Sequence, residues 1–547
     1  MHKIMCASGS SWILAALAII AALWPWIWLP TPADAAPART SPEAAPNVLP
    51  ISLEHSVMLA LENNMDIKVE RLTPLIREEE VKGETGVFFS PRMSLEAGTD
   101  RSKKPAGSVL AGTQISKTRN LDVNTGISMR SITGGAVSLD FRNKRYENNS
   151  VFQIYDPQYT SDLALTFTHP LLKNFGAGLN GIRIKVAHNN AEISKYQLKA
   201  MVTNLVVEVQ QTYWDLVLAT NDLATRRRAL EVAQHLHKRT TEMVAGGRLP
   251  TIALLQAEAA VLERELDVVA GENAFEDNQA RLKALLNLDM VHASTEYTLV
   301  PTDPPLLEPK RVSAAEGLKS ALAKRPELFQ AKLDQENRML RVRFARNQQL
   351  PEINFVGSIG LSGLGGIPTS NPLTTITVGG VPVVSLLPGG QGVGTFEGGY
   401  EDALGKLVSG DFFSYKVGFS VQIPLGNQVA RSELARARLE VEKSRITLQT
   451  LEQKIALEVE SVARAINSRL KAIEGAKSLR HLAERKLEMA QKGLELGVSS
   501  VTDVLEAQKN LSLAQRDELK TVIEYNKILV LWEKTTSTAL ERFPIDL

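Results

Sequence analysis

Two kinds of hydrophobic spacing alternate along the chain. Apolar residues seven positions apart are typical of seams between long packed helices, and this spacing occurs at Val441, Leu448, Ile455 and Val462. Apolar residues two positions apart are typical of strands with one apolar face, and this spacing occurs at Tyr415, Val417, Phe419, Val421 and Ile423. The chain is therefore predicted to be an α+β protein that is mostly α-helical.

The helical pattern predicts three pairs of helices. A first helix over 53–89 ends before Pro91, and its counterpart over 314–349 ends before Pro351, because proline disfavours helix in the residue that precedes it. Long helices are predicted over 184–244 and 429–496, and each returns after a glycine turn through 252–288 or 502–540. A helix of about 60 residues is on the order of 90 Å long, which is too long for an ordinary globular core.

The alternating pattern predicts four strands, two in each half of the chain. The first strand of each pair follows the proline, at Met93, Leu95 and Ala97 or at Ile353 and Phe355. The second strands cover Leu163, Leu165 and Phe167 in one half and 415–423 in the other. Residues 122–146 are predicted to form an extra hairpin that turns at Gly134-Gly135 and rises from the strands, and 357–400 is predicted to be a Gly/Pro-rich hairpin loop.

The order of elements occurs twice, which indicates an internal two-fold repeat. Ser52, Leu61 and Asp66 match Ser313, Leu322 and Glu327 at an offset of 261, and the glycine turns match at an offset of 250. The predicted division is a signal peptide (1–35), a flexible leader (36–50), a first repeat (51–290), a linker (291–312), a second repeat (313–541) and a C-terminal tail (542–547).

The first 35 residues have the features of a secretory signal. An apolar run from Trp12 to Leu29 follows Lys3, and Ala33-Asp34-Ala35 resembles a cleavage site. The alternative is a retained membrane anchor, which the Pro/Ala-rich stretch after the run disfavours. Cys6 is the single cysteine and would leave with the signal, so the mature chain is expected to contain no disulfide, no thiolate nucleophile and no cysteine-based metal site.

Composition argues against two classes of function. The 62 Lys and Arg residues nearly balance the 61 Asp and Glu residues, so no global field favours binding to nucleic acid. His235 and His237 point to different helix faces, and neither H-E-x-x-H nor G-x-S-x-G occurs. We expect no enzymatic activity, no metal site and no cofactor.

The strands require a partner. Four strands with one apolar face cannot close a membrane barrel, which needs roughly eight or more, so several copies of the chain are expected to share one wall. The long helices would continue that wall as a cylinder, and the function would be passive conduction. The alternative is a structural coiled-coil tether of the cell envelope, which explains the long helices but not the alternating strands.

The motifs that delimit these elements resemble those of the TolC-like outer-membrane efflux proteins over nearly the whole mature chain. They are the two helix openings SLEHSVMLALENN (52–64) and SAAEGLKSALAKRPEL (313–328), the strand exits HPLL (169–172) and IPLG (423–426), and the glycine turns before LLQAEA (254–259) and VLEAQ (504–508). The resemblance implies a homotrimer with a twelve-stranded β-barrel, each half of each chain giving two transmembrane strands, joined to an α-helical barrel in the periplasm.

The resemblance also implies functional positions at the two helical tips. Asp503 and Glu506 match inward acidic positions, which in three copies would ring the periplasmic aperture. The alternative is that both are ordinary surface acids near a helix start, where the helix dipole favours them. Docking of a periplasmic adaptor is implied for Gly247, Arg248, Leu249, Gly497, Val498 and Ser499, although the glycines also simply permit the chain to turn.

The implied function is an outer-membrane channel-tunnel that works in efflux or type I secretion. Its implied partners are a periplasmic adaptor (membrane-fusion) protein, an inner-membrane transporter reached through that adaptor, and outer-membrane lipid. The implied location is the outer membrane of a Gram-negative-type cell, with a large periplasmic part. Whether the passenger is a drug, a metal ion or a protein is left open by the sequence.

Overall fold

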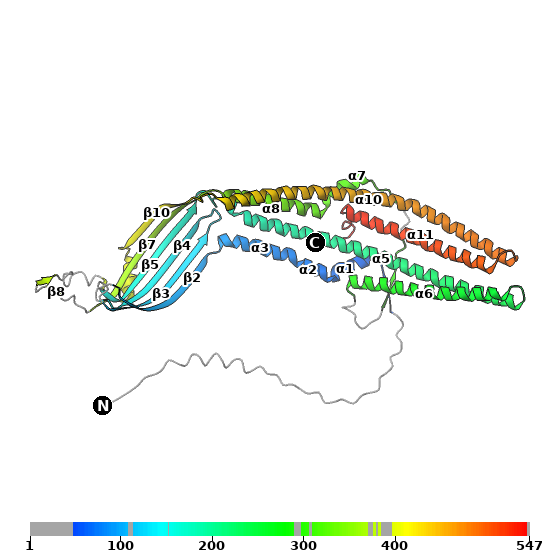
Figure 1. The fold of residues 1–547 in the computed structure, drawn as a ribbon, viewed down its shortest axis with the longest axis horizontal. Helices are drawn as coiled ribbons and strands as arrows, with labels where there is room; N and C mark the ends of the chain where they lie inside the picture. Colours follow the sequence, from blue (N-terminus) through cyan, green and yellow to red (C-terminus); the bar gives the residue numbers. More distant parts are fainter. Residues whose placement is uncertain are drawn as a thin grey trace, which may run out of the picture. The chain divides into compact units, whose positions relative to one another are not determined.

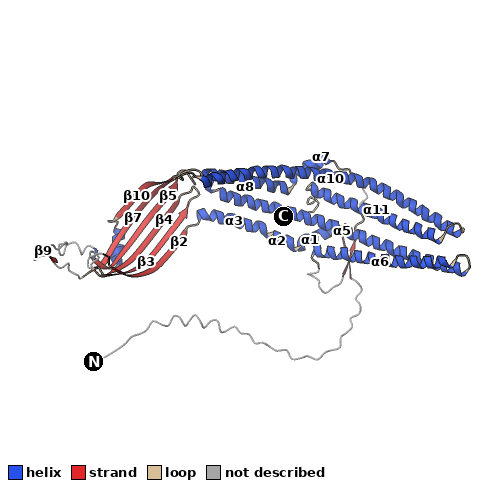
Figure 2. Ribbon diagram, viewed as in Figure 1, coloured by secondary structure: helices blue, strands red, loops and turns tan. Residues whose placement is uncertain are grey.

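The computed structural model describes residues 47–107, 113–150, 153–288, 297–305, 309–369, 376–378, 381–383 and 396–543. Within these ranges the fold is α+β and rich in helix, as predicted, with one six-stranded sheet (Figure 2). The expected signal peptide, residues 36–46 of the expected leader and residues 544–547 of the expected tail lie outside the described residues.

Two long helices, each followed by a shorter returning helix, account for most of the helical structure. They are α5 (Ile182–Ala245), α6 (Thr251–Leu286), α10 (Gln428–Glu495) and α11 (Val501–Thr535). Most predicted limits are met within a few residues. The exception is the end of α11, which falls before the expected residue 540 because Ser537 adopts a left-handed conformation with φ of 56°.

The prediction that each opening helix is continuous is wrong. The first is divided into α1 (Leu53–Asn63), α2 (Met65–Glu70) and α3 (Leu72–Phe89), and the second into α7 (Ala314–Lys324) and α8 (Pro326–Gln348). Asn64 interrupts the first because its side chain accepts a hydrogen bond from Ile67 N at 3.2 Å and so starts a new helix. Pro326 interrupts the second because it forces Arg325 into an extended conformation.

The expected leader and linker contain regular structure where they meet. Strands β1 (Asn47–Ile51) and β6 (Tyr297–Pro301) form a two-stranded sheet, so the prediction of a flexible leader through residue 50 is wrong at 47–50, and β6 lies within the predicted linker over 291–312. The physical reason is burial, since Ile51 and Leu299 belong to the hydrophobic core and are 1% and 0% exposed.

The main sheet has six antiparallel strands in the order β10-β7-β5-β4-β3-β2 (Figure 1). The strands are β2 (Arg92–Pro105), β3 (Ile115–Arg130), β4 (Ala136–Asn148), β5 (Tyr155–Pro170), β7 (Glu352–Pro368) and β10 (Phe413–Gln422). The prediction of two strands per half is therefore wrong for the first half, which supplies four. The predicted turn at Gly134-Gly135 is present, but its hairpin is longer than 122–146 and pairs within the sheet instead of rising from it.

One face of this sheet is apolar and exposed. Directly opposed residues of paired strands point to the same face, so the register defines rows that cross the sheet. One such row takes a single apolar residue from each of the six strands: Met93, Ile127, Leu139, Leu165, Ile359 and Tyr415. All six are at least 41% exposed.

The segment 357–400 is only partly the hairpin loop that was predicted. Strand β7 continues through it to Pro368, β8 (Ile376–Val378) pairs with β9 (Val381–Val383), and α9 (Tyr400–Ser409) follows. Helix α9 lies against β7 so closely that a Cβ atom at Gly363 would collide with the Ala403 carbonyl. The glycine-rich composition therefore allows a helix to pack on the sheet.

The largest hydrophobic core lies along α5, where α1, α6 and α11 pack against it. In α10 the seven-residue stripe is buried at Ile455 and Val462 and half-buried at Val441 and Leu448, as expected for a seam between helices. None of the described helices combines the length and hydropathy needed to cross a bilayer.

Candidate functional site

The tip between α10 and α11 is a tight turn centred on Gly497. Its φ of 77° lies in the left-handed region, which glycine adopts without steric cost. Val498 N and Ser499 N both donate to the Gly493 carbonyl, at 2.9 and 3.1 Å, and so satisfy the end of α10. The turn leaves Val498 81% exposed.

The tip between α5 and α6 has the same local geometry. Gly247 has a φ of 65°, and Arg248 N donates to the Met243 carbonyl at 2.9 Å. Arg248 is exposed, whereas Leu249 is half-buried. The positions predicted to dock an adaptor therefore lie at matching places on two turns, and Leu249 and Ser499 are the half-buried residues among them.

Asp503 has a local structural role at the start of α11. Its Oδ2 accepts hydrogen bonds from Ser500 N and Ser500 Oγ, both at 2.7 Å, while Asp503 N donates to Ser500 Oγ at 3.2 Å. This reciprocal arrangement is a capping box. The bond from the Ser500 backbone is the main reason that the pKa of Asp503 is lowered.

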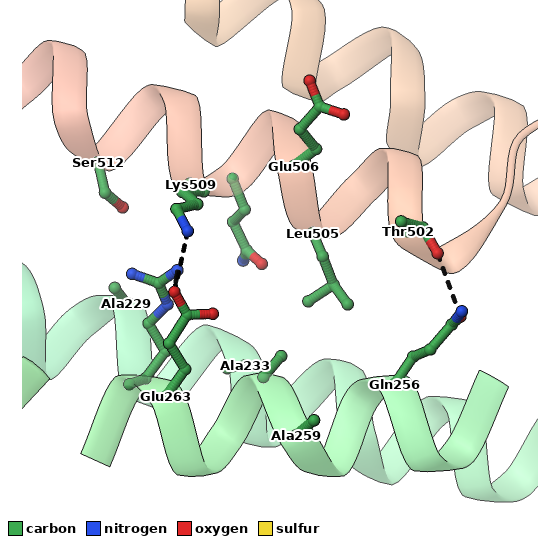
Figure 3. Close-up of a pocket in the computed structure, with 13 residues that line it drawn as sticks. Ala229, Ala233, Gln256, Ala259, Glu263, Thr502, Leu505, Glu506, Lys509 and Ser512 are labelled. Carbon is green, nitrogen blue, oxygen red and sulfur yellow. Dashed lines mark hydrogen bonds and ion pairs between the residues drawn. The ribbon is translucent and has the colours of Figure 1, made fainter. Parts of the chain in front are cut away.

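Glu506 lies one turn further along α11 and is not part of this cap. Its Oε1 is 3.8 Å from Lys486 Nζ of α10, and both side chains are mostly exposed. In Figure 3 the Glu506 carboxylate points away from α6. The two predicted acidic positions therefore have different surroundings. The Asp503 carboxylate caps its own helix, whereas the Glu506 carboxylate lies beside Lys486.

The two tips are in contact through apolar side chains. Ala253 of α6 packs with Leu494, Val501 and Val504 of the other hairpin, and the half-buried Leu249 joins this cluster. Ala253 is 5% exposed, which gives a physical reason why the first tip has alanine where the second has Asp503. A carboxylate at position 253 would be buried between the hairpins.

Polar contacts also join α6 and α11 along the walls of a cavity of about 400 Å³ (Figure 3). Thr502 Oγ1 donates to Gln256 Oε1 at 3.1 Å, and Lys509 Nζ donates to Glu263 Oε1 at 2.9 Å. The hydrogen bond from Lys509 is the main cause of the lowered pKa of Glu263. Ala229 and Ala233 of α5 form part of the cavity wall with small side chains.

Sequence reasoning missed Lys486, Lys509 and Glu263 as neighbours of the predicted positions. A signal for Lys486 existed, because residues at similar distances from the Gly497 turn face each other in a helical hairpin, and position 486 therefore faces 506. The pairing of Glu263 with Lys509 depends on how two separate hairpins pack, and local spacing carries no such information. Among the described residues, no group of three or more His, Cys, Asp or Glu side chains could hold a metal ion.

Comparison with known proteins gives a family match over part of the chain and a shared fold over most of it. The model of the family described as outer membrane efflux protein matches residues 317–522. The structure is similar to that of a membrane protein from Pseudomonas aeruginosa (17% identity, TM-score 0.62, covering 93% of this chain and 96% of that one). It is also similar to the Campylobacter jejuni CmeC outer membrane channel (16%, 0.63, 94% and 94%) and to the Neisseria gonorrhoeae MtrE outer membrane channel (16%, 0.59, 90% and 91%).

No curated protein sequence matches this chain. The resemblance to the TolC-like outer-membrane efflux proteins is nevertheless confirmed, because residues 317–522 carry the sequence pattern of the outer membrane efflux protein family and the described chain has the fold of these channels. The matched family is one of outer membrane efflux proteins, and two of these structural neighbours are outer membrane channels.

Proposed function

We propose that this chain is the protomer of a homotrimeric channel-tunnel in the outer membrane of a Gram-negative-type cell. It receives substrates from a periplasmic adaptor bound to an inner-membrane transporter and conducts them passively to the exterior. The chain is exported by its signal peptide, and its two helical hairpins descend from one duplicated unit. In this proposal the long helices of three copies close into an α-helical barrel below the membrane.

The observation that carries the proposal is the exposed apolar face of the six-stranded sheet. Exposed rows of Met, Leu, Ile and Tyr are costly in water and favourable against lipid. The same strands carry small and polar residues on the opposite face, as in the wall of a water-filled membrane barrel. One sheet of this kind cannot close by itself, so additional copies supply the rest of the wall.

The alternative, a coiled-coil tether of the envelope, explains the long helices α5 and α10 but does not explain the six-stranded sheet. A tether needs no exposed apolar face on β2 and β10, where Met93 and Tyr415 are 72% and 75% exposed. The match of residues 317–522 to an efflux family also favours the channel.

We assign the two tips to the adaptor and the periplasmic aperture. Arg248 and Val498 are the exposed tip side chains that an adaptor would contact. The turns that present them are formed by Gly247, Leu249, Gly497 and Ser499. Glu506 is the better candidate for an acidic ring, because the Asp503 carboxylate is already bonded to Ser500. The passenger class is not assigned.

Single-channel conductance in a planar bilayer, with oligomer mass measured on the same sample, tests the function. A trimer with discrete, cation-preferring openings supports the proposal, whereas a monomer or dimer without conductance supports the tether.

A matched pair of variants then tests the aperture. Glu506→Gln removes one carboxylate per copy and is expected to lower cation preference, while Gln256→Glu adds one at the equivalent position of the first tip and is expected to raise it. Unchanged cation selectivity in both variants would contradict the proposed acidic ring but would not contradict the proposed conduction.

A further inference from the structure

We propose that the wall of this channel has eighteen strands, and that the free edge of β2 in each copy pairs with the free edge of β10 in the next copy. The proposal rests on the trimeric channel proposed above and departs from the twelve strands that the family resemblance implied. The difference comes from the hairpin of β3 and β4, which each copy inserts between β2 and β5.

The inserted hairpin carries the same apolar band as its neighbours. On β3 the residues Leu121, Val123, Ile127 and Met129 face the same side, and each is between 39% and 47% exposed. From Leu121 to Met129 the strand spans roughly 27 Å along its length. With the tilt of a membrane barrel, this length covers about 20 Å along the membrane normal, which is most of an apolar band about 25 Å tall.

The opposite face of the hairpin is polar, and its polar residues lie in register with those of the other strands. The row adjacent to the apolar row contains one small or polar residue from each strand: Ser94, Gly126, Asp140, Ala164, Gly360 and Ser414. A hairpin that projected into water on both sides would gain nothing from this alternation. A hairpin within a membrane wall requires it.

The turn between β3 and β4 is held by hydrogen bonds at the place where β5 meets the helices. Gly176 N donates to the Thr133 carbonyl at 2.9 Å, and Thr133 Oγ1 lies 3.2 Å from His169 Nε2 at the end of β5. Gly134, with a φ of 100°, approaches the Asn174 carbonyl so closely that a side chain would not fit. The hairpin therefore ends at the same level as the neighbouring strands.

The two outer strands define the surface that a second copy would cover. Strands β2 and β10 each pair on one side only, so each leaves a row of backbone N–H and C=O groups without a strand partner in the described sheet. Strand β2 leads away from the helix α3 and β10 leads toward the helix α10, so pairing between copies is antiparallel, like every other pair in the sheet. The apolar row reaches both edges, at Met93 and Tyr415.

The functional consequence is a wide outlet. Barrels of roughly 16–18 strands leave an aqueous channel, so the part of the path that crosses the membrane would be open to water.

Site-directed spin labelling tests whether the hairpin lies in the wall. The mature chain is expected to lack cysteine, so single cysteines can be placed by Val123→Cys and Leu139→Cys on the apolar face and by Asn124→Cys and Asp140→Cys on the polar face. Leu165→Cys and Ala164→Cys on β5 are the matched references. In reconstituted trimers we expect labels at 123 and 139 to lose accessibility to a nickel chelate and gain it to oxygen, as at 165, while labels at 124 and 140 behave as at 164.

Equal nickel accessibility at 123, 124, 139 and 140 in a conducting trimer would overturn the eighteen-stranded wall and leave the proposed function intact. Loss of the trimer and of conductance in the native chain would instead overturn the proposed function.

Cross-linking between subunits tests whether the edge of β2 in one copy pairs with the edge of β10 in the next. Chains carrying both Met93→Cys and Tyr415→Cys are expected to give a dimer and trimer ladder with a short bis-maleimide, whereas Met93→Cys paired with Ala164→Cys is expected to give none. Absence of the ladder from the first pair would overturn the β2–β10 contact.

Discussion

Tyr213 of α5 and Asp303, which follows β6, are joined by two hydrogen bonds. Tyr213 Oη donates to Asp303 Oδ2 at 2.8 Å and accepts from Asp303 N at 3.1 Å. The same Oδ2 accepts from Leu53 N at 2.6 Å, at the start of α1. A single buried hydroxyl therefore links the long helix to the connection between the two halves and to the first helix of the chain.

Replacing Tyr213 by phenylalanine is expected to destabilise this junction. The ring of Tyr213 is fully buried, so Tyr213→Phe keeps the packing and removes the hydroxyl. Loss of a buried partner of a carboxylate costs about 1–3 kcal/mol, measured as a decrease in the free energy of unfolding. Tyr196→Phe, which keeps a ring stacked on Phe329, is the control and is expected to change stability less.

The stability of the chain at alkaline pH is expected to depend on the same tyrosine. Burial raises the pKa of Tyr213 from 10.0 to about 12, so the folded state holds this proton more tightly than the unfolded state. The stabilisation is complete below pH 10 and is lost as the pH rises toward about 12. We expect the native chain to lose more unfolding free energy over this window than Tyr213→Phe does. Parallel curves for the two proteins would contradict the assignment.

Two helical glycines are expected to respond in opposite directions to alanine. In α7 a Cβ atom at Gly317 would collide with the ring of Trp532, and overpacking costs about 1–3 kcal/mol. In α10 the exposed Gly475 has nothing within 4 Å of that position, and alanine stabilises an open helix site by about 0.5–1 kcal/mol. Thermal unfolding of Gly317→Ala and Gly475→Ala checks the sign of each change.

Glu533 near the end of α11 is expected to oppose folding at neutral pH. Burial raises its pKa, although Arg542 and Lys310 partly offset the shift, and its Oε2 has no hydrogen-bond partner among the described residues. A raised carboxyl pKa gives stability that is complete below the unfolded value and is lost as pH rises through the folded value. Glu533→Gln is therefore expected to be more stable than the native chain at pH 7, and the difference is expected to vanish in acid. A less stable variant at pH 7 would show that the charge is favourable there.

The sequence predicted the long helices because their spacing repeats over many turns. Their ends were marked by Gly247 and Gly497, where only a residue tolerant of positive φ makes the turn. The breaks at Asn64 and Pro326 were missed because the apolar pattern continues across them. The side-chain cap at Asn64 and the extended conformation that Pro326 imposes on Arg325 decide the local structure.

The sheet was harder to predict because its strands carry charge. Strand β3 contains Lys117 and Arg119 beyond its apolar band and β4 contains Arg142 and Lys144, which favoured a hairpin in water. Pairing of β3 with β2 and of β4 with β5 over most of their length makes both strands part of the sheet. At the tips, the family resemblance pointed to Asp503 and Glu506, but only the packed structure distinguishes a carboxylate in a capping box from one beside Lys486.

The capping box at the second tip allows the structural role of Asp503 to be separated from any role in conduction. Ser500→Ala removes the hydroxyl that bonds Asp503 in both directions and leaves both carboxylates in place. Loss of a serine N-cap costs about 1 kcal/mol, so we expect faster hydrogen exchange in the first turn of α11. Pro250→Ala is the matched control, because Pro250 makes no side-chain cap bond, and exchange at the start of α6 is expected to change less. If Ser500→Ala frays α11 and cation preference stays the same, capping is a structural function of Asp503; if preference changes as well, the position of the carboxylate matters for conduction.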